Sequence, residues 1–184
     1  MDIHDGLNNT LMLLKHRLKA NTSRPAVEVV QEYAPLPHVE CYPGLLNQVF
    51  MNILANAIDA LDEKAETQSP KEWLDHPGHI TVQTSWVHEL GKKWIQVVIA
   101  DNGAGMSPSV QQRIFDPFFT TKPIGKGTGM GMSISYQVVT ERHSGQLSCS
   151  SIVGNGTTFT IKLPMTQTSL RLHHTVQHPT AIMS

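Results

Sequence analysis

The chain has 184 residues, of which 40% are hydrophobic and 16% charged, and its net charge is −1 with histidine neutral. These values are typical of a single folded globular domain, and the lack of net positive charge argues against a nucleic-acid partner. The two cysteines are too few for a disulfide framework, and no apolar run approaches the roughly 20 residues of a membrane span, so we expect a cytoplasmic domain without membrane contact of its own.

The first predicted element is an amphipathic helix over residues 2–20, because its large apolar residues recur every three or four positions. Asp2 can cap the start of this helix. A break follows, and the β-branched stretch 26–33 predicts a strand. We therefore assign residues 1–25 to an N-terminal helix and linker, after which the main domain, 26–164, begins.

Residues 45–63 form the strongest predicted helix, with apolar residues over most of its circumference, as expected of a helix packed on a sheet. A polar stripe nevertheless recurs at spacings of four, four, three and four residues: Gln48, Asn52, Asn56, Asp59 and Glu63. Buried amides are costly unless they are satisfied. We expect Glu63 to face solvent, and Asn52 and Asn56 to contact a ligand or an ion. Their carbonyl oxygens suit Mg²⁺, which keeps several waters and needs few protein ligands.

The remaining predicted elements are mostly strands. A polar surface connection over 64–78, with a helical turn at 71–74, leads to strands 79–88 and 93–100, which a turn at 89–92 joins. Two helices follow, a short one over 108–115 capped by Ser107 and one over 130–142. The last predicted element is a hairpin, in which Gly154-Asn155-Gly156 joins strands 145–152 and 157–163. Residues 165–184 have no periodicity, and we expect a flexible tail there.

Two glycine clusters lie within residues 97–136, one directly after a predicted buried strand and one directly before a helix. Glycine lets the backbone approach a phosphate closely, and a helix start offers free N–H groups to an anion. Asp101, at the strand end, can accept a hydrogen bond from the amine of adenine, while Lys122 and Lys126 are the nearest charges for terminal phosphates. The second cluster has neither the Walker pattern nor a directly preceding strand, so it is neither a P-loop nor a dinucleotide fingerprint.

Taken together in this order, the motifs resemble those of the ATP-binding catalytic domain of sensor histidine kinases, of the GHKL ATPase superfamily. NQVFMNILANAIDAL (47–61) is similar to the N box, DNGAGM (101–106) to the first glycine box, IFDPFFTTK (114–122) to the F box and GKGTGMGMSI (125–134) to the second glycine box. GNGTTFTIKLP (154–164) resembles the closing strand pair. The resemblance covers residues 26–164.

The resemblance implies a two-layer α/β sandwich of the GHKL (Bergerat) type, with helices on one face of a mixed sheet and ATP between the central helix and a lid over residues 120–128. It implies Mg²⁺ at Asn56, a phosphate or metal-side contact by Asn52, adenine recognition by Asp101 and a water-linked adenine contact by Thr157. The residues implied at the ATP site are Asn52, Asn56, Asp59, Asp101, Gly103, Gly105, Met106, Phe119, Lys122, Lys126, Gly127, Thr128, Gly129, Met130, Gly131 and Thr157. Three phenylalanines, Phe115, Phe118 and Phe119, would pack the lid. Lys126 departs from the commoner GGTGLGL pattern, so it is either a phosphate contact or a solvated charge.

By this resemblance the chain would bind Mg·ATP and donate the γ-phosphate to a histidine on a dimerisation hairpin, with a response regulator downstream. His4 lies in IHDGLNNTLMLL, which resembles the acceptor box. Only 48 positions separate His4 from Asn52, however, which leaves no room for the second helix of an acceptor hairpin. We therefore expect the acceptor outside this chain and His4 as an exposed residue of a packing helix. His143, at a predicted helix end, could interact with the helix dipole.

Two interpretations from other classes stay open. Another GHKL ATPase would hydrolyse ATP with water, using a carboxylate near Gln48, where this chain has an amide; a Ser/Thr kinase of the anti-sigma type is a variant of this interpretation. The second alternative is a non-catalytic nucleotide-sensing or partner-docking module, for which substitutions of Asn56 and Asp101 would leave Mg·ATP binding unchanged.

Overall fold

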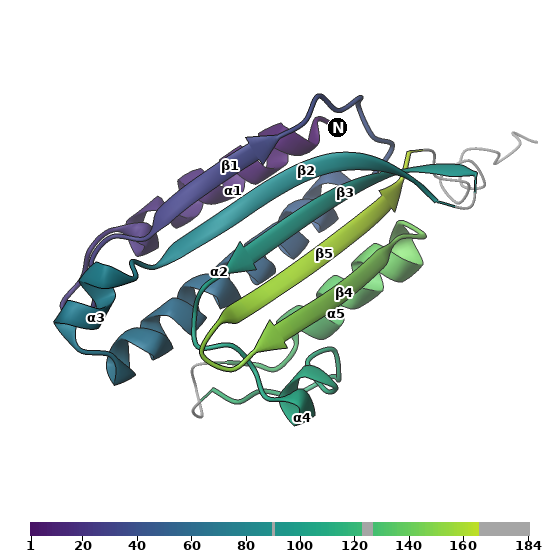
Figure 1. Cartoon of the computed structure of the whole chain (residues 1–184). Coiled ribbons are helices and arrows are strands. Elements are labelled where there is room, and N and C mark those ends of the chain that lie inside the picture. Colours follow the sequence, from purple (N-terminus) through teal and green to yellow (C-terminus); the bar gives the residue numbers. More distant parts are fainter. Residues whose placement is uncertain (90, 123–126, 166–184) are drawn as a thin grey trace, which may run out of the picture.

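Five strands form one mixed sheet in the computed structural model, which describes residues 1–89, 91–122 and 127–165 (Figure 1). The strands are β1 (Glu28–Tyr33), β2 (His79–Glu89), β3 (Lys92–Asp101), β4 (Gln146–Ile152) and β5 (Gly156–Pro164). Their order across the sheet is β1-β2-β3-β5-β4. β1 runs parallel to β2, and the other neighbouring pairs are antiparallel, which confirms the mixed sheet expected from the sequence.

Three helices cover one face of this sheet, namely α1, α2 and α5 (Figure 1). The described helices are α1 (Ile3–Leu18), α2 (Pro43–Thr67), α3 (Pro70–Asp75), α4 (Pro108–Gln111), α5 (Gly131–Gln137) and a π-helical turn, η1 (Val138–Arg142), that continues α5. This arrangement confirms the two-layer α/β architecture. None of the helices in the described part of the chain is both long enough and apolar enough to cross a bilayer.

β3 illustrates why the sheet has one buried face. Ile95, Val97 and Ile99 are buried at alternate positions, whereas the residues between them are half-buried. Because successive side chains of a strand point to opposite faces, the buried set points toward the helices. Asp101 continues this set at the end of the strand and is therefore directed toward the helical layer.

α2 is the central helix of the molecule, and its largest apolar residues are fully buried: Leu46, Phe50, Ile53, Leu54, Ile58 and Leu61. It extends beyond the predicted range of 45–63 at both ends. Pro43 is accommodated because the first turn of a helix has N–H groups without helical partners. The run after Glu63 contains Lys, Ala and Glu, which favour helix, so the helix continues to Thr67.

α1 begins as predicted, because the Asp2 side chain accepts hydrogen bonds from the first backbone N–H groups of the helix. Its residues Ile3, Leu7 and Leu14 belong to the same buried cluster as the sheet and α2. Gly6 lies where α1 meets α2, since a Cβ at this position would approach the Phe50 ring to 3.3 Å. The proposed division of the chain at residue 25 thus separates two segments that share one core.

The segment after α4 differs from the sequence prediction. The helix expected over 108–115 ends at Gln111. Beyond it the chain forms turns, in which the Asp116 N–H donates to the Arg113 carbonyl over 2.8 Å. Pro117 restricts only Asp116 and does not account for an end at Gln111, for which the local sequence offers no reason.

Two other helices also differ in detail from the prediction. The helical turn expected at 71–74 is a complete short helix, α3, whose start carries a capping box formed by Ser69 and Glu72. The helix expected over 130–142 is present, but its last turn is the π-helical η1.

Candidate functional site

The polar stripe of α2 lies partly in solvent, as expected for Glu63, and partly toward the interior, as expected for Asn52 and Asn56. Gln48 and Glu63 are exposed, whereas Asn52, Asn56 and Asp59 are half-buried. The three half-buried residues are three or four positions apart and therefore lie on one side of the helix. They are the first component of the candidate site.

Asn52 is fixed against the start of α5. Its amide nitrogen donates to the Gly131 carbonyl over 2.9 Å and to the Ser135 hydroxyl oxygen over 3.0 Å. Ser135 is fully buried and itself donates to the Gly131 carbonyl. The amide NH₂ is thus held by the protein, which leaves the Asn52 carbonyl oxygen as the group available for a ligand.

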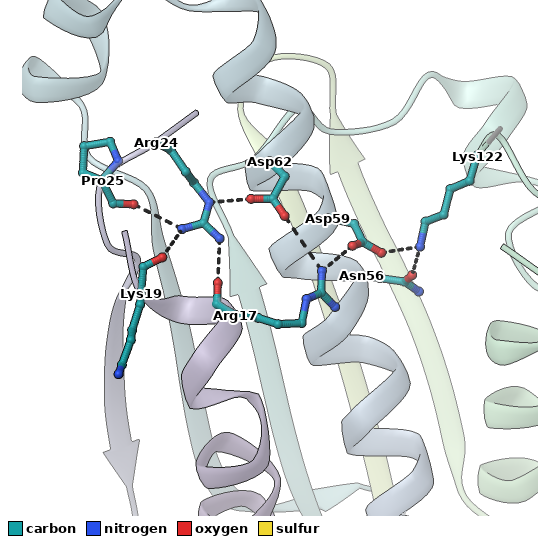
Figure 2. Close-up of polar contacts among 8 residues, drawn as sticks. All are labelled: Arg17, Lys19, Arg24, Pro25, Asn56, Asp59, Asp62 and Lys122. Atoms are coloured by element: carbon teal, nitrogen blue, oxygen red, sulfur yellow. Dashed lines mark hydrogen bonds and ion pairs between the residues drawn. The ribbon is translucent and has the colours of Figure 1, made fainter. Parts of the chain in front are cut away.

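Asn56 and Asp59 share one cation, the Lys122 ammonium (Figure 2). The Lys122 Nζ donates to Asn56 Oδ1 over 2.9 Å and to Asp59 Oδ2 over 2.5 Å. All three belong to the residue set predicted at the ATP site, so the structure brings this part of the set together. An amide oxygen and a carboxylate that converge on a cation are also the type of oxygen ligands that Mg²⁺ accepts.

The fit of a Mg²⁺ ion rests on the Asn56 oxygen, because the Asp59 carboxylate is also paired with Arg17. Within the described residues, no cluster of three or more His, Cys, Asp or Glu side chains could hold a metal. Mg²⁺ does not need such a cage, because it is commonly held by one or two protein oxygens together with waters and substrate phosphates. Asn56, the predicted metal ligand, would therefore hold the ion, whose charge would offset that of the phosphates.

Asp101 forms the second component of the site. Its carboxylate is 9% exposed and accepts a hydrogen bond from the Gly103 N–H over 2.8 Å. Burial raises the pKa of Asp101 to about 6, despite the opposing effect of backbone N–H groups from Gly103 and Thr157. A strongly perturbed carboxylate at a strand end is typical of a functional group.

The loop after Asp101 contacts the turn of α2 that carries Asn56 and Asp59. The Ala104 N–H donates to the Ala60 carbonyl over 3.0 Å, and a Cβ at Gly103 would lie only 2.8 Å from Ala60. Only glycine allows this approach. The Asp101 end of the site and the Asn56–Asp59 pair therefore adjoin one another.

Ser151 links two predicted site residues and was not identified from the sequence. Its hydroxyl oxygen accepts from the Met106 N–H over 2.8 Å and lies 2.9 Å from the Thr157 hydroxyl. Thr157 is buried, and it pairs directly with Ser151 between β4 and β5 and with Asp101 between β3 and β5. Ser151 lies beside Thr157 because of the register of β4 against β5. The pattern of a single sequence does not define that register, so it could not identify Ser151.

The F-box loop and the second glycine cluster meet at Gly129. Gly129 has a φ of 66°, and a Cβ there would lie 2.5 Å from the Phe118 carbonyl carbon. Phe115 packs on Tyr136, with ring centroids 5.1 Å apart. Phe119 lies beneath the Arg113 guanidinium, 4.4 Å from ring centroid to Cζ.

Phe118 itself is 76% exposed, so it does not pack within the described part of the chain. Of the residues predicted at the second glycine cluster, Gly127, Thr128, Gly129, Met130 and Gly131 are described, and Gly131 contacts Asn52 as stated above. Outside the described residues lie Lys126, the middle of the predicted lid (123–126) and all but the first residue of the predicted tail.

His4 is not the exposed residue expected from the sequence. Its ring stacks on Tyr33, with centroids 4.5 Å apart and planes within 3°, and its Nε2 lies 2.9 Å from the Thr84 hydroxyl. The reason is that the first turn of α1 lies directly over β1 and β2. His4 thus joins α1 to the sheet.

His143 also differs from its expected role as a charged dipole partner. It is fully buried, its Nδ1 lies 2.8 Å from the Val138 carbonyl, and its Nε2 accepts from the Tyr42 N–H over 3.0 Å. Burial lowers the pKa of His143. An acceptor nitrogen and a lowered pKa indicate a neutral ring that joins the end of η1 to the start of α2.

Solved structures of histidine kinases share this fold. The catalytic domain of histidine kinase ThkA superposes with a TM-score of 0.70 at 21% identity, covering 91% of this chain and 95% of that one. Full-length ShkA in complex with AMPPNP has a TM-score of 0.68 at 22% identity, over 89% of this chain and 30% of ShkA. The fold is therefore that of histidine-kinase catalytic domains.

The chain belongs to the family described as histidine kinase-, DNA gyrase B- and HSP90-like ATPase, which matches residues 42–167. Among similar proteins, the two-component sensor PprA of Pseudomonas aeruginosa is 38% identical over 65% of this chain, and the signal transduction histidine-protein kinase AtoS of Escherichia coli K12 is 39% identical over 66%. Sporulation kinase E of Bacillus subtilis is 30% identical over 88% of this chain. The chain spans only 12%, 17% and 19% of these three relatives, respectively.

Proposed function

We propose that this chain binds Mg·ATP between α2 and the segment from β3 to α5, and donates the γ-phosphate to a histidine outside the chain. The observation that carries the proposal is the contact between the loop after Asp101 and the α2 turn that bears Asn56 and Asp59. It joins a buried carboxylate, suited to the amine of adenine, to a pair of oxygens suited to a cation. The family membership supports the same ligand.

Each group then has a proposed task. Asp101 accepts a hydrogen bond from adenine, and the Thr157 hydroxyl lies beside it through the strand register. Asn56 binds Mg²⁺, and the Asn52 carbonyl oxygen faces the phosphates or the metal. Lys122 supplies a positive charge to the terminal phosphates. The second glycine cluster, together with Lys126 outside the described residues, would provide further phosphate contacts.

The proposed reaction moves the γ-phosphoryl group from ATP to an imidazole nitrogen of the acceptor, which leaves ADP. Phosphoryl transfer depends mainly on positioning and on charge neutralisation, so a site that holds the triphosphate and its cation is an adequate donor half. His4 is an unsuitable acceptor because it is stacked on Tyr33 and bonded to Thr84. We propose that the acceptor lies on a dimerisation hairpin of the parent kinase, that a cytoplasmic response regulator receives the phosphate, and that this domain acts in the cytoplasm.

Calorimetric titration with Mg·ATP tests the binding site. Asn56→Ala and Asp101→Asn should each weaken binding. If neither substitution changed the affinity, the assignment of the site would be contradicted.

Incubation with [γ-³²P]ATP tests the acceptor: the chain alone should stay unlabelled, whereas the acceptor hairpin of the parent kinase, added in trans, should be labelled. Label that appears on the chain and disappears in His4→Gln would refute the proposal.

The interpretation as another ATPase is disfavoured by Gln48. This residue is exposed on α2 and carries an amide, which cannot act as a general base. Steady ATP hydrolysis by the isolated chain, without any acceptor, would favour that interpretation instead.

A further inference from the structure

Five charged side chains of alternating sign run from the end of α1 across α2 to Lys122 (Figure 2). In order they are Arg24, Asp62, Arg17, Asp59 and Lys122. Arg24 Nε lies 2.6 Å from Asp62 Oδ1, and Arg17 Nη2 lies 3.8 Å from Asp62 Oδ2. The two carboxylate oxygens of Asp59 have different partners: Oδ1 lies 2.5 Å from Arg17 Nη2, and Oδ2 lies 2.5 Å from Lys122 Nζ. Asp59 is therefore shared between a cation of α1 and a cation of the nucleotide site.

Arg24 holds the end of α1 in the place from which Arg17 reaches α2. Arg24 is 3% exposed, and its Nη2 donates to the Arg17 carbonyl over 2.8 Å. Its Nη1 donates to the carbonyls of Lys19 and Pro25. Because the Arg17 and Lys19 carbonyls lie at the end of the helix, the guanidinium caps α1 and ties it to Asp62 at the same time. The backbone of Arg17 is thus fixed relative to Asp59.

We propose that Arg17 is a positioning residue of the nucleotide site, which acts on Lys122 through Asp59. The inference rests on the proposed function, in which Mg²⁺ binds Asn56 and Lys122 serves the phosphates. In the structure, the Lys122 ammonium occupies the Asn56 oxygen that the Mg²⁺ would take. Lys122 must therefore leave Asn56 when Mg·ATP binds, and its hold on Asp59 decides how easily it leaves.

Arg17 makes this transfer easier for two reasons that act in the same direction. While Lys122 is on Asp59, Arg17 shares the carboxylate charge and so weakens the attraction of Asp59 for Lys122. Once Lys122 has moved to the phosphates, Arg17 keeps Asp59 paired, so that no uncompensated carboxylate faces the triphosphate. Without Arg17, Asp59 would hold Lys122 more strongly and would repel the nucleotide.

Arg17→Gln should raise the Kd for Mg·ATP about three- to ten-fold, the range expected for a partly exposed ion pair near a charged ligand. Arg17→Lys, which can still reach a carboxylate, should restore most of the affinity. In an Asp59→Asn background, Arg17→Gln should have no further effect, because the residue through which it acts is gone. Isothermal titration of the four proteins gives this double-mutant cycle.

Lys15→Gln is the matched control, since Lys15 is exposed on the same helix and its loss changes the net charge equally. It should leave the Kd unchanged. An Arg17→Gln effect that equals that of Lys15→Gln, or that persists undiminished beside Asp59→Asn, would overturn the inference. Asp101→Asn tests the proposed function separately. If Asp101→Asn fails to weaken Mg·ATP binding, the proposed function itself is wrong. If Asp101→Asn weakens binding but Arg17→Gln does not, only the role of Arg17 is contradicted.

Discussion

Asp101 is a carboxylate that the fold keeps partly protonated near neutral pH. Because its pKa is raised to about 6 by burial, its contribution to folding stability is present below its unfolded pKa of about 4 and is lost as the pH rises through about 6. A residue that works against stability in its ionised form is a candidate for a role in binding. The ionised form is the one that accepts the adenine amine most strongly.

The affinity for Mg·ADP should therefore rise with pH between 5 and 7 through the ionisation of Asp101. Titration of the nucleotide phosphates also contributes, but equally in Asp101→Asn, so the ratio of the two Kd values isolates the residue. At pH 7.5 we expect Asp101→Asn to cost roughly 1.5–3 kcal/mol of binding free energy, as for a lost hydrogen bond to a charged group. A ratio that stays constant across this pH range would exclude Asp101 from ligand contact.

His143 should make the fold sensitive to acid. Its pKa is lowered by burial, so its contribution to stability is full above its unfolded pKa of about 6.5 and is lost as the pH falls below that value. His143→Leu should cost about 1–3 kcal/mol at pH 7.5, because leucine offers the Tyr42 N–H no acceptor. In urea unfolding, the wild type should then lose more stability than the variant between pH 7.5 and pH 5.5; equal losses would contradict a neutral, buried ring.

The sequence predicts which polar residues of α2 face inward, but it does not predict their partners. Asn52 and Asn56 stand out because amides interrupt an apolar helix at helical spacing. Their contacts with Ser135 and Lys122 depend on where α5 and the F-box loop return to α2, which no local pattern specifies. Arg17 has no distinguishing pattern at all, since basic residues are common near helix ends.

At the scale of elements, the periodic segments are predicted well and their ends less well. Helical periodicity identifies α1 and α2. The β-branched stretch 26–33 identifies β1, although no side chain of that strand is fully buried. The ends are less regular: α4 stops at Gln111 rather than at residue 115, and favourable residues after Glu63 extend α2. The π-helical turn η1 has no sequence signal of its own that the 3.6-residue period would reveal.

Gly156, at the turn between β4 and β5, is crowded by neighbouring backbone, whereas Gly44 is not, so the two glycines form a matched test. Gly156 has a φ of 108°, and a Cβ there would lie 1.9 Å from the Asp101 carbonyl oxygen. Gly156→Ala should cost about 2–5 kcal/mol through backbone strain and overpacking. Gly44, in the first turn of α2, has nothing within 4 Å of its Cβ position. Gly44→Ala should instead stabilise by about 0.4–1 kcal/mol, because it restricts the unfolded chain.

Urea unfolding measures both glycine variants. Equal midpoints for the two proteins would show that the close approach at Gly156 is absent. Loss of Mg·ATP binding should accompany Gly156→Ala only, since the clash falls on the backbone of Asp101 itself.

At the scale of the whole molecule, α1 should unfold together with the sheet, because they share one core. Leu7 is fully buried and Leu13 is 70% exposed on the same helix. Leu7→Ala should lower the global free energy of unfolding by about 2–5 kcal/mol, while Leu13→Ala should change it by less than about 0.5 kcal/mol. Tryptophan fluorescence reports the transition outside residues 1–25, through Trp73 of α3, Trp86 of β2 and Trp94 of β3. A Leu7→Ala protein whose sheet unfolds at the wild-type midpoint would mean that residues 1–25 are an independent unit.

Among the described strands, β1 lies at the edge of the sheet, pairs only with β2 and has no fully buried side chain. β3 is central instead, and its residues Ile95, Val97 and Ile99 are buried. Strands with fewer buried apolar contacts open locally at lower free energy. In native-state hydrogen exchange, we expect the amides of β1 and of the end of α1 to open at lower free energy than those of β3. Arg17 would then be part of the region that opens first, so transient detachment of one sheet edge would remove a counter-charge from Asp59 without unfolding the nucleotide site.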